Sequence, residues 1–105
     1  MNILLFSKVK IIKSTTAESC SYGNIGFDIY FDKPIDKSFA EYLGKLGKYK
    51  LDNSFEEPYF KIIVRGYYTL KGSLGVNYLR MIVPESIYQQ IYKDFENYIN
   101  NYQNI

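Results

Sequence analysis

The residues best suited to contacting a phosphate or an aromatic base lie together in one short stretch, 65–71, which reads RGYYTLK. A basic residue, a glycine and two aromatic residues in succession are typical of strands that stack bases on rings and hold phosphates with cations. Arg65 and Tyr67 would act from the same side of such a strand, because side chains alternate between its two faces. The stretch therefore indicates a binding surface, although its composition suits more than one kind of partner.

The strand signature of RNA-recognition domains provides a test of this interpretation. After a basic residue, a glycine and a first ring, that signature requires a small residue and then a second stacking ring. Tyr68 stands at the small position and Thr69 stands at that of the second ring. The stretch therefore lacks the part of the motif that stacks a second base, and we do not assign the chain to that family.

Residues that could perform catalysis or bind a metal are scarce. Cys20 is the one cysteine and there is no histidine, whereas a reactive thiolate needs a histidine or a strongly positive environment. Zinc sites draw mainly on cysteine and histidine, so the same two facts argue against a transition metal. The adjacent Glu56 and Glu57 supply fewer oxygen ligands than calcium requires. We therefore expect no catalytic residues, no metal and no cofactor.

The composition is that of a small globular chain. Its 105 residues suit a single domain over 1–105, and hydrophobic residues at 47% are enough for one core. The formal net charge of +2 is low for a dedicated nucleic-acid binder, so any attraction for anions must come from local clustering of cations. The apolar run 3–6 is too short for a signal peptide or a membrane span. Together with the lone cysteine, this favours a cytoplasmic protein without membrane association.

The spacing of apolar residues predicts the secondary structure. Apolar residues at every second position indicate four strands, with a fifth optional at 48–52; the four lie at 2–13, 24–32, 59–71 and 76–83. Helical spacing appears twice, first in a short segment that begins near Pro34 or Asp36 and then in a long one that follows Pro84.

This order of elements predicts an α+β fold, an antiparallel-rich sheet of four or five strands with two helices packed on one face. It is the order of a ferredoxin-like sandwich whose last strand has moved to the front of the chain, that is, a circular permutation. The first helix would then link two parallel strands that have one strand between them.

If both helices cover one side of the sheet, the other side stays open. By alternation this open face carries Leu4, Phe6, Lys8, Lys10, Asp28, Tyr30, Tyr59, Lys61, Ile63, Arg65, Tyr67, Tyr78 and Arg80. Its expected partner-binding centre consists of Tyr59, Lys61, Arg65, Tyr67, Tyr78 and Arg80. Aromatic residues and arginine are enriched in protein interfaces. We therefore predict a non-catalytic binding domain that engages a protein partner, or a second copy as a dimer, through this face or a sheet edge.

Other interpretations of the same face stay open. Tyrosines among lysines and arginines also suit the binding of single-stranded nucleic acid, whose affinity would fall steeply with salt. The face could equally be an ordinary solvated surface, since these residue types suit the exposed side of any sheet. A small enzyme whose site the sequence does not mark is the last alternative.

Overall fold

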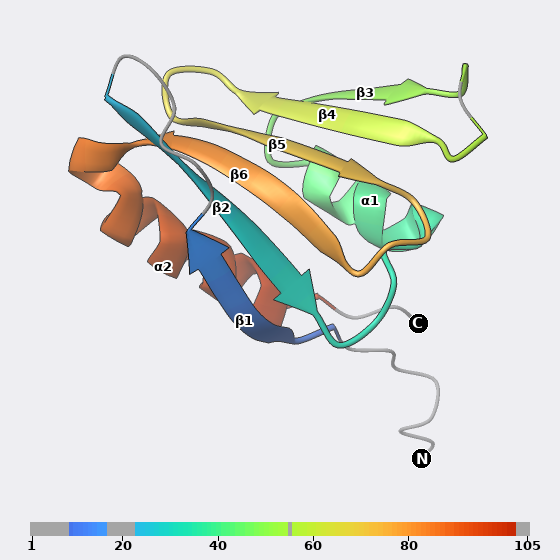
Figure 1. Cartoon of the computed structure of the whole chain (residues 1–105), viewed down its shortest axis with the longest axis horizontal. Coiled ribbons are helices and arrows are strands. Elements are labelled where there is room, and N and C mark those ends of the chain that lie inside the picture. The colour runs from blue at the N-terminus through green and yellow to red at the C-terminus, as the bar shows by residue number, and fades with distance from the viewer. Residues whose placement is uncertain (1–8, 17–22, 55, 103–105) are drawn as a thin grey trace.

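The computed structural model describes residues 9–16, 23–54 and 56–102, and its centre is a six-stranded antiparallel sheet in the order β1-β2-β6-β5-β4-β3 (Figure 1). The strands are β1 (Ile11–Thr16), β2 (Asn24–Phe31), β3 (Lys48–Asp52), β4 (Tyr59–Val64), β5 (Tyr68–Ser73) and β6 (Tyr78–Pro84). Two helices complete the fold: α1 (Lys37–Gly44) and, after the short 3₁₀ helix η2 (Glu85–Ile87), α2 (Tyr88–Asn100). Within the described residues, no helix has the length and apolar character needed to cross a membrane.

The strands form because their side chains alternate between a buried and an exposed environment. In β6 the odd-numbered Leu79, Met81 and Val83 are buried, whereas Tyr78 and Arg80 are exposed. The other central strands contribute further fully buried side chains: Ile29, Phe31, Phe60, Ile62 and Leu70. One face of the sheet thereby forms most of the core. The alternation of buried and exposed side chains has the period of two expected for a half-buried strand.

The two helices cover this core with the buried apolar side chains along one side of each helix. Asp36 starts α1 as its N-cap, and its side chain accepts a hydrogen bond of 2.8 Å from the backbone N–H of Phe39. The helices also contact each other, because the rings of Tyr42 and Tyr98 stack with centroids 4.3 Å apart. Each of these two hydroxyls donates a 2.6 Å hydrogen bond to the backbone carbonyl of the other tyrosine. The tyrosine pair therefore joins the last turn of α1 to the last turn of α2.

The structure corrects the predicted fold class. The sheet has six strands and not four or five, and three strands, β6, β5 and β4, lie between β2 and β3, so the ferredoxin-like sandwich, permuted or not, is wrong. The segment 59–71 is a hairpin and not one strand, because Gly66 has a φ of +86° in the turn from Val64 to Tyr67. The optional strand at 48–52 is present as β3.

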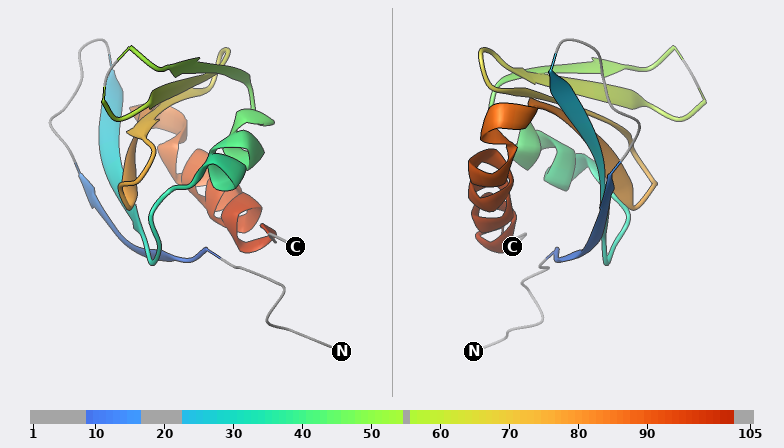
Figure 2. Two further views of the ribbon diagram at one scale, coloured as in Figure 1. Left: turned by 90° about the vertical axis from the view of Figure 1, so that its right-hand side faces the viewer. Right: turned by 60° about the vertical axis from the view of Figure 1, so that its left-hand side comes forward.

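The predicted position of the helices is also wrong. They do not cover one face as a single layer: α1 packs near β3 and β4, whereas α2 packs near β6 and reaches β2 through the ring contact between Phe27 and Tyr88. Helix α1 carries the chain from β2 to the opposite edge of the sheet at β3, and not across a single intervening strand (Figure 1). The sheet is twisted and curved, which separates the positions of the two helices (Figure 2).

Candidate functional site

The candidate site lies on what we call the outer face, the strand side chains that alternate with the buried ones. Residues paired across antiparallel strands point to the same side, so the pairing register arranges the outer face in rows. One row consists of cations from four neighbouring strands, with Arg80 opposite Lys71, Lys71 opposite Lys61, and Lys61 opposite Lys50. At the usual strand separation of about 4.8 Å, this basic row spans roughly 14 Å.

The basic row places like charges directly opposite one another, an arrangement that destabilises a sheet. Lys71 and Lys61 each have a cation as the paired residue on both neighbouring strands. A carboxylate compensates the positive charge at the Arg80 end of the basic row. The Arg80 guanidinium donates hydrogen bonds to both carboxylate oxygens of Asp28, from Nε at 2.9 Å and from Nη2 at 3.2 Å. The stability of the sheet alone therefore gives no reason for this row.

A second row, one step along the strands, is aromatic. The Nζ atom of Lys13 lies 4.8 Å from the centroid of the Tyr30 ring, and that ring stacks on Tyr78 at 5.2 Å. The next strand, β5, contributes only Ser73 to this row, and β4 then contributes Tyr59, which is paired with Ser73. The aromatic row is therefore interrupted at Ser73.

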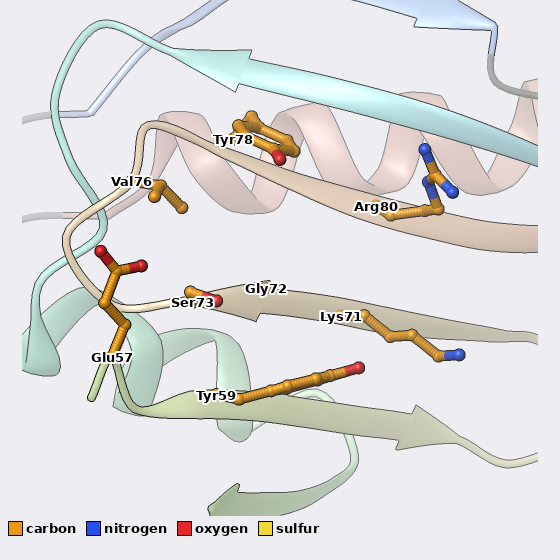
Figure 3. Close-up of a pocket in the computed structure, with 8 residues that line it drawn as sticks. All are labelled: Glu57, Tyr59, Lys71, Gly72, Ser73, Val76, Tyr78 and Arg80. Carbon is orange, nitrogen blue, oxygen red and sulfur yellow. The ribbon is translucent and has the colours of Figure 1, made fainter. Parts of the chain in front are cut away.

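The interruption forms a groove with a volume of about 440 Å³ (Figure 3). Tyr59 and Tyr78 stand on either side of β5, and Lys71 and Arg80 lie toward one end of the groove (Figure 3). Tyr78 is 42% exposed, so its ring is available to a ligand even though it stacks on Tyr30. The lining residues are Glu57, Tyr59, Lys71, Gly72, Ser73, Val76, Tyr78 and Arg80.

The backbone under the groove is held by close packing on the inner face. A Cβ atom added to Gly72 would lie 2.7 Å from Cζ of Phe60, so glycine allows this buried ring to pack directly against β5. Beyond Tyr59, a second hollow of about 440 Å³ is lined by Lys50 to Asn53 and by Lys61. Tyr59 thus separates two hollows that both border the basic row.

The structure brings together four of the six predicted partner-binding residues. Tyr59, Lys61, Tyr78 and Arg80 lie on the outer face, in the two rows described above. Arg65 and Tyr67 lie elsewhere, in the turn between β4 and β5, where Tyr67 is 57% exposed. Among the wider set, Asp28 and Tyr30 are on the outer face, while Lys10 is exposed just before β1. Leu4, Phe6, Lys8 and Cys20 lie outside the described residues.

The site residues that sequence reasoning missed include Lys50, Lys71 and Ser73. Lys71 continues the alternation of Lys61, Ile63 and Thr69 by one further step, which was the signal that could have found it. The position of Lys50 depended on whether 48–52 forms a strand. Ser73 falls between the predicted strands 59–71 and 76–83, whereas it is the last residue of β5.

The outer face carries ammonium, guanidinium and carboxylate groups, phenol rings and a serine hydroxyl. The described residues contain no group of three acidic, cysteine or histidine side chains able to hold a metal. A strongly raised pKa belongs instead to Tyr68 on the inner face, where burial, with smaller effects of Tyr98 and Asp94, raises the pKa to about 12. No protein-family model matches the chain, and neither curated proteins nor solved structures include a significant match to it.

Proposed function

We propose that this protein is a small non-catalytic binding domain whose outer face binds an acidic segment of a partner protein. The observation that carries the proposal is the basic row, in which Lys71 and Lys61 are flanked across the strands only by cations. An acidic partner would neutralise this repulsion, so complementary charge would favour both the rate and the specificity of binding. The groove beside the row supplies the aromatic contact area that interfaces favour.

A protein suits this face better than a nucleic acid because the face also carries carboxylates. Asp28 is bonded to Arg80, Asp52 is paired with Tyr59, and Glu57 lines the groove. These carboxylates would repel a continuous line of phosphates, whereas a protein segment can present both signs of charge. The net charge of +2 agrees with this preference. The lone cysteine supports the cytoplasm as the compartment in which this binding would occur.

Single-stranded nucleic acid is a second candidate because of the aromatic row. Tyr30, Tyr78 and Tyr59 offer ring faces next to cations, which is the combination that stacks bases and holds phosphates. A second copy of the chain is another possible occupant of the outer face or of a sheet edge. The experiments below separate these two outcomes from the proposed one.

The main test is fluorescence anisotropy at low ionic strength with a labelled peptide in which glutamate alternates with serine. The wild-type protein should bind this peptide and not the matched peptide with glutamine in place of glutamate. The double variant Lys61→Glu/Lys71→Glu should bind at least about tenfold more weakly, because charge reversal replaces attraction by repulsion. Lys37→Glu/Lys93→Glu, which changes the net charge equally on the exposed sides of α1 and α2, should bind nearly as the wild type does.

The proposal fails if the glutamate peptide shows no binding at low ionic strength. An oligothymidylate that binds more tightly than the peptide, with an affinity that falls steeply with salt, would replace the protein partner by single-stranded nucleic acid. Light scattering over a range of protein concentrations tests self-association. A mass that rises with concentration, and does not rise in Lys61→Glu/Lys71→Glu, would make a second copy the occupant.

A further inference from the structure

We propose that the groove above Ser73 binds an aromatic side chain of the partner, and that this segment is extended, with its aromatic residue and an acidic residue two positions apart. The inference rests on the proposed function, because it names the kind of acidic segment that the outer face would recognise. Three features carry it: the interruption of the aromatic row, the spacing of the two rows along β5, and the distribution of charge at the ends of the groove.

The interruption has the width of one aromatic ring. Tyr59 on β4 and Tyr78 on β6 are separated by β5 alone, which corresponds to two strand spacings or roughly 9.5 Å. A ring placed over β5 would lie about 4.7 Å from each of the strands that carry these tyrosines, and aromatic pairs prefer centroid separations of about 4.5–7 Å. Ser73 contributes only a hydroxyl to the space between them (Figure 3). A ring in the groove would thus join the existing pair of Tyr30 and Tyr78 to Tyr59 in one continuous row.

The spacing along β5 relates the ring to the charge. Ser73 and Lys71 are two residues apart on one strand and point to the same side, so their side chains are separated by roughly 6.7 Å. An extended peptide has the same period, so an aromatic side chain over Ser73 puts the side chain two positions along over Lys71. An acidic residue at that position would lie between the cations Arg80 and Lys61. An acidic residue next to the aromatic one would instead point away from the sheet.

The charges at the two ends of the groove set the direction. Lys71 and Arg80 lie toward one end, whereas Glu57 and Val76 line the other (Figure 3). An acidic residue would be attracted at the first end and repelled by Glu57 at the second. The acidic residue of the partner therefore lies on the Lys71 side of its aromatic residue.

The test compares two peptides of identical composition that differ only in order, Phe-Ser-Glu-Ser-Glu and Phe-Glu-Ser-Glu-Ser, each labelled at one end. In the first, phenylalanine and glutamate can face the sheet together; in the second, they point to opposite sides. The first peptide should bind several-fold more tightly, since an aromatic pair contributes about 0.5–1.5 kcal/mol, or about two- to twelvefold in affinity. Replacing its phenylalanine by alanine should remove this advantage.

Filling the groove provides the matched test on the protein. Ser73→Phe closes the interruption with the protein's own ring, so the preference for the first peptide should disappear while binding through the basic row persists. Thr69→Phe adds the same ring to the same face of β5 away from the groove lining, and should keep the preference. Tyr78→Ala removes one wall and should also abolish the preference, which covers the case in which Ser73→Phe does not fold. Circular dichroism and urea unfolding establish which variants are folded.

The possible failures are distinguishable. Equal binding of both peptides by the folded wild type, or an unchanged preference in folded Ser73→Phe, would overturn the ring subsite while leaving the acidic partner in place. If the wild type binds neither of these peptides nor the alternating glutamate peptide, the proposed function falls, and the inference falls with it.

Discussion

Neighbouring residues of β4, β5 and β6 lie in two different environments, and the contrast between them separates folding from function. On the inner face, Phe60, Leu70 and Leu79 have no exposed surface. On the outer face, Tyr59, the sequence neighbour of Phe60, and Lys71, the neighbour of Leu70, line an open groove. Lys71 also belongs to the row of opposed cations. The inner face carries the buried apolar side chains of a packed core, whereas the outer face places like charges opposite one another, which destabilises a sheet. Such departures are expected where a protein binds something.

The largest expected effect comes from truncating the inner face. Phe60→Ala should lower the free energy of unfolding by about 3–5 kcal/mol, because it removes a fully buried ring and leaves a cavity. Its neighbour Tyr59→Ala, on the outer face, should cost less than about 1 kcal/mol. Urea unfolding of both variants measures the difference. Equal losses for the two variants would mean that Tyr59 belongs to the core and does not primarily serve binding.

A smaller contrast is expected one strand away, between Gly72 and Ser73. Gly72→Ala should lower the free energy of unfolding by about 1–3 kcal/mol, since the added Cβ would lie 2.7 Å from Phe60 Cζ and 3.3 Å from Leu79 Cβ. The Ser73 side chain points into the groove, so Ser73→Ala should change the free energy of unfolding by less than about 0.5 kcal/mol. Thermal or urea unfolding of the two variants measures these changes. An unchanged free energy of unfolding in Gly72→Ala would show that the Phe60 ring can shift without loss of stability.

The inner face should also be sensitive to alkaline pH. Burial raises the pKa of Tyr68 from 10.0 to about 12, so in this range the folded protein keeps a proton that the unfolded chain releases. The contribution to stability is therefore complete below pH 10 and is lost as the pH rises toward about 12. Urea unfolding across this window should show a shallower decline in Tyr68→Phe than in the wild type. Parallel declines would contradict the assigned role of Tyr68.

The smallest expected effect is a gain in stability on the outer face. Lys71→Gln should raise the free energy of unfolding by about 0.2–1 kcal/mol, because it relieves repulsion from Arg80 and Lys61. Arg80→Gln should instead lower it slightly, since Asp28 loses its bonding partner. Added salt should reduce the effect of Lys71→Gln. A loss of stability in Lys71→Gln would indicate that this lysine is needed by the fold.

Part of this architecture could be predicted from alternation and capping. The strand expected at 24–32 corresponds to β2, and the helix expected after Pro84 corresponds to α2. Alternation did not reveal the turn at Gly66, because the three residues between Val64 and Tyr68 leave the even-numbered positions facing inward on both sides of the turn. The predicted strand therefore had the correct inward and outward residues in the parts that became β4 and β5. It placed Arg65 and Tyr67 on the open face, although they belong to the turn.

By itself, the sequence determined which sides of β2, β4 and β6 face the core, because burial of apolar side chains depends on a local period of two. It also limited the start of α1 to Pro34 or Asp36, and the structure shows that Asp36 caps the helix through a hydrogen bond within its own first turn. Only the tertiary structure decided which outward residues become neighbours. Lys50, Lys61, Lys71 and Arg80 lie on four consecutive strands and meet in one row through the order and register of β3 to β6. That register depends on the geometry of the turns that join the strands and on which strands pair, and the alternation within one strand does not encode either.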